Sequence, residues 1–232
     1  MDSSVSAVIL AGGSGTRLSA NIPKQYLNIG DKPVLAYSLD VFNTLSFVGE
    51  IIVVAAEDML DYCRNNIIEL FCSKKPVKLV KGGAFRQESS FKGVIAASSP
   101  YVMVHDGARP FAAADDITRL YKTMLVNNSA ILAAPVTDTI KETTQDAQIM
   151  RTIERDNLWA AATPQAFLRE TLIKAHKMAL DTNFVGTDDA SLLEFIGEKV
   201  TIVECSSRNI KITTSEDLVF ADFLVRLGEH KL

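Results

Sequence analysis

Residues 5–27 read VSAVILAGGSGTRLSANIPKQYL. The apolar run that ends at Leu10 has the composition of a buried strand, and it passes directly into a glycine-rich turn. Glycines let a backbone come close to a ligand, and successive free N–H groups form a concave site for an anion. Two cations, Arg17 and Lys24, follow closely enough to reach the same anion. The segment therefore predicts a strand that ends in a binding site for a triphosphate.

Two common phosphate-binding motifs fit this segment less well. A Walker A loop requires Gly, four residues and then Gly-Lys-Ser/Thr, and no glycine here has that continuation. The dinucleotide fingerprint requires a third glycine where this chain has Leu18. Glycine-rich turns also occur without a ligand in many α/β proteins, so the glycines alone leave a structural turn open. The cations Arg17 and Lys24, the second directly after a proline, favour the binding site.

Together, these residues resemble the nucleotidyltransferases that make nucleotide sugars and related compounds, whose motif is Gly-Gly-x-Gly-x-Arg followed by Pro-Lys. The continuation Pro23-Lys24-Gln25 is similar to the cytidylyltransferases that act on polyol phosphates. Seven further blocks of that family follow in order over nearly the whole chain: 82–89 (GGAFRQES), 104–110 (VHDGARP), 138–141 (DTIK), 155–159 (RDNLW), 163–165 (TPQ), 187–190 (TDDA) and 209–214 (NIKITT).

Two branches of this family share the glycine loop and the NIKITT block. One branch acts on 2-C-methyl-D-erythritol 4-phosphate in the non-mevalonate isoprenoid pathway, and the other on ribitol 5-phosphate or a similar pentitol phosphate. The DTIK and RDNLW blocks favour the first branch. The resemblance then implies cytidylyl transfer from CTP with release of pyrophosphate. The other alternative, a non-catalytic nucleotide-binding module on the same scaffold, would have lost site residues. Arg17, Lys24, Asp106 and Lys211 are all present, which argues against it.

The composition limits the possible classes of protein. A chain of 232 residues with 47% hydrophobic residues, 7 prolines and 12 glycines predicts a globular protein with a large core. The net charge of −4 gives no general attraction to nucleic acid or to an anionic membrane, so any phosphate must be bound by a few placed cations. The three scattered cysteines suit a reducing compartment rather than disulfides or zinc.

The first residues and the hydropathy pattern bear on where in the cell the protein is located. The first residues, MDSS, lack the basic region of a signal peptide, and no apolar run reaches the length of a membrane span. We therefore expect a cytoplasmic protein that binds no membrane. A plastid enzyme whose transit peptide had been removed would look the same.

Short apolar runs alternate with helical patterns along the chain. Strands are expected at 5–10, 50–55, 77–80, 101–105, 130–134 and 200–204, and helices at 33–44, 57–71, 86–98 and 114–126. Thr214 and Asp217 predict a capping pair that opens a last helix, with Phe220, Phe223, Leu224 and Leu227 facing inward. This alternation predicts an α/β, Rossmann-like three-layer sandwich with a mostly parallel sheet and helices on both faces. Ligands then gather at the carboxyl ends of the strands.

Residues 135–155 interrupt this alternation with polar and β-branched residues. Two short alternating runs on either side of 145–147 predict a β-hairpin. The hairpin has too few apolar residues for a core of its own, so it either packs on another surface or forms a solvated flap. The resemblance implies that this β-arm crosses to a second subunit and forms much of a homodimer interface. We therefore expect a single nucleotidyltransferase domain, 1–232, with one excursion.

The resemblance also implies roles for single residues. Arg17 and Lys24 would clamp the triphosphate in the transition state, and Asp106 would hold Mg²⁺. Further contacts to the nucleotide are implied for Ala11, Gly12, Gly13, Ser14, Gly15, Gly82, Gly83, Arg86, Ser89, Asp106 and Gly107. Contacts to the polyol phosphate are implied for Arg109, Thr139, Arg155, Thr163 and Lys211. Arg155, from the neighbour's arm, and Lys211 would act as catalytic cations that aim the substrate phosphate.

Simpler interpretations stand beside several of these assignments. Asp106 could be a helix cap, and Lys24 or Arg155 could be a solvated surface cation. We interpret His105 as a hydrogen-bonded structural residue rather than a catalytic base. Ser207-Arg208 stands where many relatives carry an acidic residue, so no second metal ligand is assigned there, and Gly107 replaces the usual alanine, a change that should be tolerated.

Overall fold

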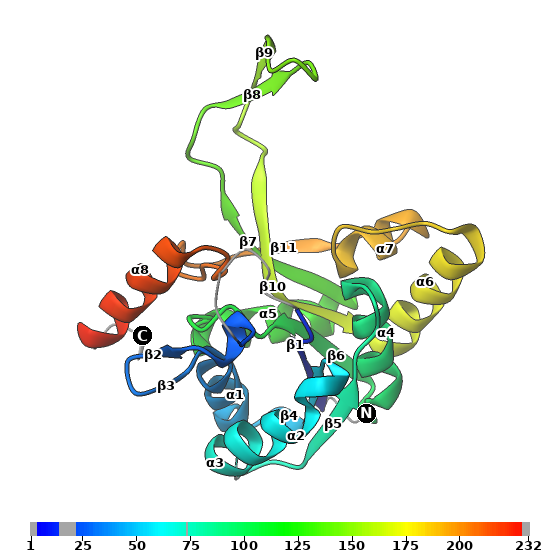
Figure 1. Cartoon of the computed structure of the whole chain (residues 1–232). Helices are drawn as coiled ribbons and strands as arrows, with labels where there is room; N and C mark the ends of the chain where they lie inside the picture. Colours follow the sequence, from blue (N-terminus) through cyan, green and yellow to red (C-terminus); the bar gives the residue numbers. More distant parts are fainter. Residues whose placement is uncertain (1–3, 14–21, 73, 229–232) are drawn as a thin grey trace.

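The computed structural model describes residues 4–13, 22–72 and 74–228. Figure 1 shows a central sheet with helices on both sides and a long arm that projects from one edge. The sheet has the strand order β11-β7-β10-β6-β1-β4-β5. Its strands are β1 (Val5–Ala11), β4 (Val48–Ala55), β5 (Val77–Lys81), β6 (Tyr101–Asp106), β7 (Ser129–Pro135), β10 (Trp159–Leu168) and β11 (Thr201–Glu204).

The sheet is parallel except for one strand. β10 runs antiparallel to both β6 and β7, while β1 pairs in parallel with β4 and β6. In the β1–β6 pair, Leu10 lies opposite Asp106, so the two strands end side by side. This register brings the loops that follow β1 and β6 to the same edge of the sheet.

Helices cover both faces of the sheet, which confirms the expected three-layer α/β fold. One core lies under α1 (Val34–Thr44), α5 (Ala114–Asn127) and the 57–71 segment. The other core lies under α4 (Arg86–Ala96), α6 (Arg169–Thr182) and α7 (Asp189–Phe195). Alternate residues of β1 serve the two cores, because Ile9 packs in the first and Val8 in the second.

The expected elements mostly appear within one or two residues of their expected ends. The 57–71 segment is a series of short turns rather than one helix: η2 (Glu57–Met59), α2 (Leu60–Cys63), η3 (Arg64–Ile68) and α3 (Glu69–Phe71). β10, α6 and α7 complete the sheet and its second helical layer, and the apolar pattern had not indicated them. In the described part of the chain, no helix has both the length and the apolar content needed to cross a bilayer.

The last helix, α8 (Ser215–Arg226), begins at the expected capping box, in which Thr214 and Asp217 bond reciprocally. Its expected inward face is wrong in part. Leu224 is buried, but Phe220, Phe223 and Leu227 are about half exposed. The inward position between them is Ala221, whose small side chain lets α8 pack closely against the hairpin of β2 (Asn28–Ile29) and β3 (Lys32–Pro33).

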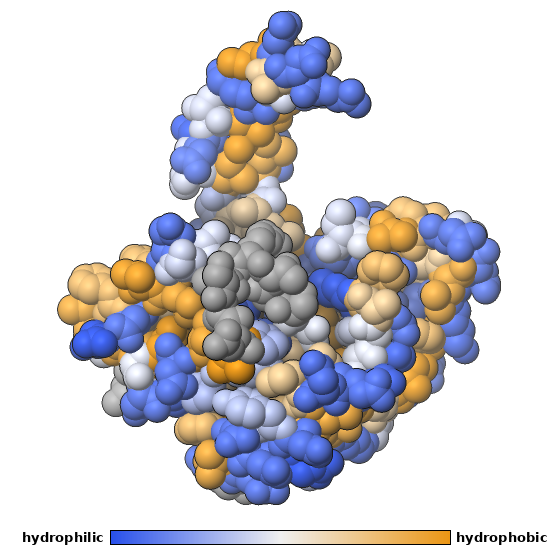
Figure 2. All heavy atoms as spheres, in the orientation of Figure 1, coloured by the Kyte–Doolittle hydropathy of each residue, from blue (hydrophilic) through white to orange (hydrophobic). Residues whose placement is uncertain are grey.

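The predicted hairpin is present as β8 (Ile140–Thr143) and β9 (Ile149–Ile153), which pair antiparallel. A turn that places Ala147 at φ +58° joins the two strands. The hairpin stands clear of the body (Figure 1), and Ile149 and Met150 are 66% and 63% exposed. Figure 2 shows apolar surface along this arm. Its contact with a second subunit stays a prediction.

Candidate active site

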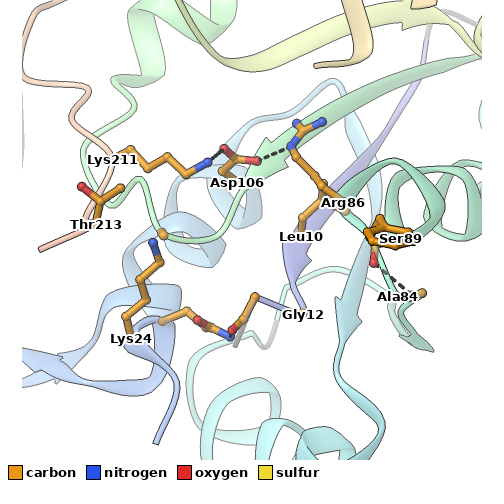
Figure 3. Close-up of a pocket in the computed structure, with 14 residues that line it drawn as sticks. Leu10, Gly12, Lys24, Ala84, Arg86, Ser89, Asp106, Lys211 and Thr213 are labelled. Carbon is orange, nitrogen blue, oxygen red and sulfur yellow. Dashed lines mark hydrogen bonds and ion pairs between the residues drawn. The ribbon is translucent and has the colours of Figure 1, made fainter. Parts of the chain in front are cut away.

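A pocket of about 400 Å³ opens at the carboxyl ends of β1 and β6 (Figure 3). Eight of the predicted site residues meet in its wall. Among the described residues, its lining is Leu10, Gly12, Gly13, Lys24, Gln25, Gly83, Ala84, Phe85, Arg86, Ser89, Asp106, Ala108, Lys211 and Thr213. The segments that contribute these residues are far apart in the sequence, and the parallel sheet brings them to one edge.

A buried glutamine shapes the start of the glycine turn. Gln25 Nε2 donates to the carbonyl oxygens of Ala11, at 2.6 Å, and Gly13, at 3.1 Å. Gln25 belongs to the short helix η1 (Lys24–Tyr26), so this anchor also places Lys24 in the pocket wall (Figure 3). The predicted residues Ser14, Gly15 and Arg17 lie outside the described part of the chain.

Asp106 is the charged centre of the pocket. Its Oδ2 accepts a bond of 2.7 Å from Lys211 Nζ, and its Oδ1 accepts one of 3.1 Å from Arg86 Nε. Burial opposes ionisation of Asp106, but the charges of Arg86 and Lys211 outweigh it and hold the pKa of this carboxyl well below its usual range. Asp106 is therefore a carboxylate at any physiological pH.

The backbone around Asp106 is fixed by buried hydrogen bonds. Its N–H donates to Thr163 Oγ1 at 3.0 Å, and the same hydroxyl lies 3.1 Å from His105 Nδ1. His105 Nε2 lies 3.1 Å from the carbonyl oxygen of Arg109. Burial lowers the pKa of His105 to about 4, so the ring is neutral and both its nitrogens are occupied. The structural interpretation of His105 agrees with this geometry.

The loop between β5 and α4 forms another wall of the pocket. Ser89 Oγ accepts a bond of 3.0 Å from the Gly83 N–H. A Cβ at position 82 would lie 3.0 Å from Ser89 Oγ and 3.3 Å from the Ala55 carbonyl oxygen, so glycine there lets three backbone segments come together. Gly82 supports this wall from outside the described lining, whereas Gly83 and Ser89 are part of it.

Gly107 and Ala11 lie outside the described pocket lining but directly next to residues that belong to it. Ala11 is 1% exposed at the end of β1. The N–H of Gly107 donates to the Leu10 carbonyl oxygen at 2.9 Å. A Cβ at position 107 would lie 2.8 Å from Leu35 Cδ1 and 3.1 Å from the same carbonyl oxygen, so glycine relieves a close contact in this chain. An alanine here would require Leu35 to move.

The residues predicted to bind the second substrate fall into two groups. Lys211 lies in the pocket, and Arg109 and Thr163 lie beside it; Arg109 Nη1 donates to the Asn209 carbonyl oxygen at 2.6 Å. Thr139 and Arg155 instead lie at the exposed base of the arm, where Arg155 Nη1 donates to the Thr137 carbonyl oxygen. The single chain does not bring these two residues into its own pocket lining, as far as that lining is described.

Sequence reasoning assigned no role to three buried residues behind the pocket. Asp189 accepts a bond of 2.9 Å from Arg86 Nη1. Gln165 Oε1 accepts from the N–H groups of Asp189 and Ala190, both at 3.1 Å, and Asn209 Nδ2 donates to the Thr163 carbonyl oxygen at 2.9 Å. All three lie in the sequence blocks on which the resemblance rests. The sequence therefore marked these positions but did not indicate what their side chains contact.

The side chains around Asp106 suit Mg²⁺ only if a single protein carboxylate serves as ligand. Within the described ranges, no cluster of three or more His, Cys, Asp and Glu side chains could surround a metal ion. Mg²⁺ commonly takes one or two protein carboxylates and completes its shell with water and substrate phosphates. Asp106 supplies one ionised carboxylate that faces the pocket, and the cations Arg86 and Lys211 beside it could bind phosphate groups. These residues fit that pattern.

Comparison with known proteins assigns the family. The model of the 2-C-methyl-D-erythritol 4-phosphate cytidylyltransferase family matches residues 5–227. This chain belongs to that family. Curated 2-C-methyl-D-erythritol 4-phosphate cytidylyltransferases from Caldanaerobacter subterraneus subsp. tengcongensis and Syntrophotalea carbinolica are 44% and 42% identical to it. The alignments cover 96% and 98% of this chain and 99% of each relative.

Solved structures of 2-C-methyl-D-erythritol 4-phosphate cytidylyltransferases share the fold. The 4-diphosphocytidyl-2C-methyl-D-erythritol synthase from Anaerococcus prevotii aligns with a TM-score of 0.86 at 33% identity, over 97% of both chains. The Thermus thermophilus cytidylyltransferase aligns with a TM-score of 0.79 at 30% identity, over 96% of this chain and 99% of that one. The predicted family is confirmed, and the ribitol 5-phosphate alternative is not favoured.

Proposed function

We propose that this chain joins CTP and 2-C-methyl-D-erythritol 4-phosphate to give 4-diphosphocytidyl-2-C-methyl-D-erythritol and pyrophosphate. The family match over residues 5–227 supports the reaction. The observation that carries the site is the convergence of Lys24, Arg86, Asp106 and Lys211 on one pocket at the carboxyl edge of the sheet. This pocket combines backbone turns for a triphosphate with cations for two phosphate groups.

The chemistry needs positioning and charge rather than a strong base. A phosphate oxygen of the methylerythritol phosphate attacks the α-phosphorus of CTP, a new P–O bond forms, and the bond to the β-phosphate oxygen breaks as pyrophosphate leaves. The attacking oxygen is already anionic near neutral pH. The barrier lies in bringing anions together and in the charge that develops on the phosphate oxygens. The described pocket lining, which holds one carboxylate and no histidine, suits this chemistry.

Lys24 and Lys211, which both lie in the pocket lining, would neutralise phosphate charge. Lys24 follows the glycine turn, so we place it against the triphosphate. Lys211 precedes α8, and we place it between Asp106 and the phosphate of the second substrate. Arg17 would add a planar, bidentate contact that a lysine cannot reproduce; its assignment rests on the sequence motif. Each charge that is fixed before the reaction stabilises the transition state without reorganisation.

Asp106 would hold Mg²⁺, with its ionised carboxylate as the protein ligand. When bound, the ion supplies positive charge against the phosphate oxygens. Gly83, Arg86 and Ser89 would surround the cytidine, with Gly82 keeping the backbone close to the base. Because the closely packed backbone at Gly82 and Gly83 leaves only a small space for the base, we expect this wall to accept a pyrimidine and to reject a purine.

The arm would complete the site of a second subunit. Thr139 and Arg155 carry polar groups at the base of a hairpin whose apolar side chains are exposed in the single chain. In a homodimer, the 135–155 arm would bury that face and bring Arg155 beside the partner's substrate phosphate, with Arg109 and Thr163 supporting the same subsite. We propose that the chain works in the cytoplasm as such a dimer of single domains, without nucleic acid or membrane partners.

Steady-state pyrophosphate release tests the proposed substrates. The wild-type protein is assayed with CTP or ATP, and with 2-C-methyl-D-erythritol 4-phosphate or ribitol 5-phosphate. We expect the highest kcat/KM with CTP and the methylerythritol phosphate, and poor use of ATP. Equal turnover of CTP and ATP would contradict the nucleotide assignment, and a preference for ribitol 5-phosphate would contradict the acceptor assignment.

A further inference from the structure

Arg86 connects the pocket to a second carboxylate behind it. Its Nε donates to Asp106 Oδ1 at 3.1 Å, and its Nη1 donates to Asp189 Oδ2 at 2.9 Å. Arg86 lies in the first turn of α4, and Asp189 in the first turn of α7, 103 positions later. The Asp189 side chain is 1% exposed and is not part of the described pocket lining, so it meets a bound nucleotide only through Arg86.

Asp189 is itself held in one position. Its Oδ1 accepts a hydrogen bond from Ser90 Oγ, and its N–H donates to Gln165 Oε1 at 3.1 Å. His176 Nε2 lies 3.8 Å from Oδ1, but burial lowers the pKa of His176, so the charge partner of Asp189 is Arg86. A buried carboxylate is costly unless it is paired and hydrogen-bonded. This pairing therefore ties the guanidinium to a fixed point outside the pocket.

The two hydrogen bonds of Arg86 would respond differently to a bound ligand. Asp106 faces the pocket, and any cation or phosphate group that engages it or Lys211 changes its bonding. Asp189 is shielded from the pocket, so a ligand would leave its bond to Arg86 in place. An arginine held by Asp106 alone would be free to leave the pocket wall at the moment the nucleotide arrives.

We propose that Asp189, supported by Ser90, is a positioning residue that keeps Arg86 in the nucleotide wall while Asp106 exchanges its partners for ligand. This inference rests on the proposed use of CTP at the pocket. It predicts that losing Asp189 weakens the nucleotide subsite and leaves the phosphate subsite at Lys211 intact. Comparing the effects on the two substrates therefore distinguishes this positioning role from a general loss of structure.

A double-mutant cycle tests the proposal, with the Kd of CTP and the KM of each substrate as readouts. Asp189→Asn should raise the Kd and KM for CTP about tenfold, as loss of a buried charge-assisted hydrogen bond would. The KM for 2-C-methyl-D-erythritol 4-phosphate should stay within about twofold, because its subsite is untouched. In an Arg86→Gln background, Asp189→Asn should cause no further loss, because it acts through Arg86. Ser90→Ala should show a smaller effect with the same pattern.

Asp188→Asn is the matched control. Asp188 is the adjacent carboxylate; it caps α7, its Oδ2 accepts a bond of 2.7 Å from Gln165 Nε2 rather than from Arg86, and asparagine also caps helices. If Asp189→Asn fails to fold, Ser90→Ala carries the same cycle. An unchanged Kd for CTP in the folded variant, or an equal loss in both backgrounds, would overturn the proposal. Absence of CTP binding and turnover by the wild-type protein would instead overturn the proposed function.

Discussion

Asp106 Oδ2 lies 2.7 Å from Lys211 Nζ, across 105 positions of the sequence. The other oxygen of the same carboxylate accepts a bond from Arg86. Asp106 is thus ionised and oriented by its neighbours, and these neighbours are the groups that would bind phosphate. Such an arrangement costs little reorganisation when charge develops in the reaction.

Asp106→Asn should raise the Mg²⁺ concentration needed for half-maximal activity by about tenfold or more and should lower kcat, because the amide removes the anionic ligand at nearly constant size. The measurement is pyrophosphate release as a function of Mg²⁺. Asp115→Asn, an exposed carboxylate on α5, is the control. An unchanged Mg²⁺ dependence would make Asp106 a structural residue, and full activity in excess chelator would exclude the metal.

Lys24→Ala should lower kcat by about a hundredfold, the typical cost of one preorganised charge contact. The control is Lys81→Ala, which removes an exposed lysine paired with Glu57 and should leave kcat unchanged. Thermal unfolding of both variants separates catalysis from stability. A Lys24→Ala protein with nearly full kcat would remove this lysine from the clamp. The sequence-based assignment of Arg17 is tested in the same assay, since Arg17→Lys keeps the charge but loses the bidentate contact.

Glu50 gives a prediction about stability rather than catalysis. This buried carboxylate accepts bonds of 2.6 Å from the Ser6 and Ser98 hydroxyls, and its Oε2 lies 2.8 Å from Lys78 Nζ. Although burial opposes it, these bonds lower the pKa of Glu50 from 4.5 to about 2. The stability it contributes is therefore fully present above pH 4.5 and is lost as the pH falls toward 2.

Glu50→Gln should accordingly reduce the free energy of unfolding at pH 7 by about 2 kcal/mol. The difference between wild type and variant should shrink as the pH falls from about 4.5 toward 2. Denaturant unfolding at several pH values measures both effects. Glu57→Gln, at an exposed ion pair, should change stability little. A difference that stays constant down to pH 2 would show that ionisation of Glu50 is not the source.

Arg155→Ala should chiefly raise the KM for 2-C-methyl-D-erythritol 4-phosphate and spare CTP binding. If Arg155 serves the partner's site, mixing Arg155→Ala with Lys24→Ala and allowing subunit exchange should restore activity. Each heterodimer then holds one site with both defects and one intact site, so it should recover roughly half of the wild-type dimer's activity. No recovery after demonstrated exchange would show that Arg155 serves its own subunit or none.

Much of the fold followed from the sequence because parallel strands buried on both faces are short apolar runs. The position of the candidate pocket could be predicted because loops after such strands share one edge, so the glycine turn at 11–13 and Asp106 meet there. β10 gave no such signal: its residues WAAATPQAFL are small or polar through the middle, and its antiparallel direction depends on the arm that precedes it. A one-dimensional pattern carries little information about that reversal.

Two misses have the same physical origin in long-range packing. The inward face of α8 follows Ala221 because a small residue fits against β2 and β3, whereas the larger Phe220 and Phe223 remain half exposed. The Arg86–Asp189 pair joins helices from different parts of the chain. Hydrophobicity and local spacing predict neither contact, since each depends on an element from a distant part of the chain that packs beside the helix.

The reaction products test the central claim most directly. A ³¹P NMR spectrum of the wild-type protein with CTP, Mg²⁺ and equal amounts of 2-C-methyl-D-erythritol 4-phosphate and ribitol 5-phosphate reports which phosphorus is attacked and which acceptor is used. Attack of the methylerythritol phosphate at the α-phosphorus predicts equal growth of pyrophosphate and of one cytidine diphosphate ester, with ribitol 5-phosphate unconsumed. Formation of CMP or CDP in place of pyrophosphate, or consumption of ribitol 5-phosphate first, would contradict the account.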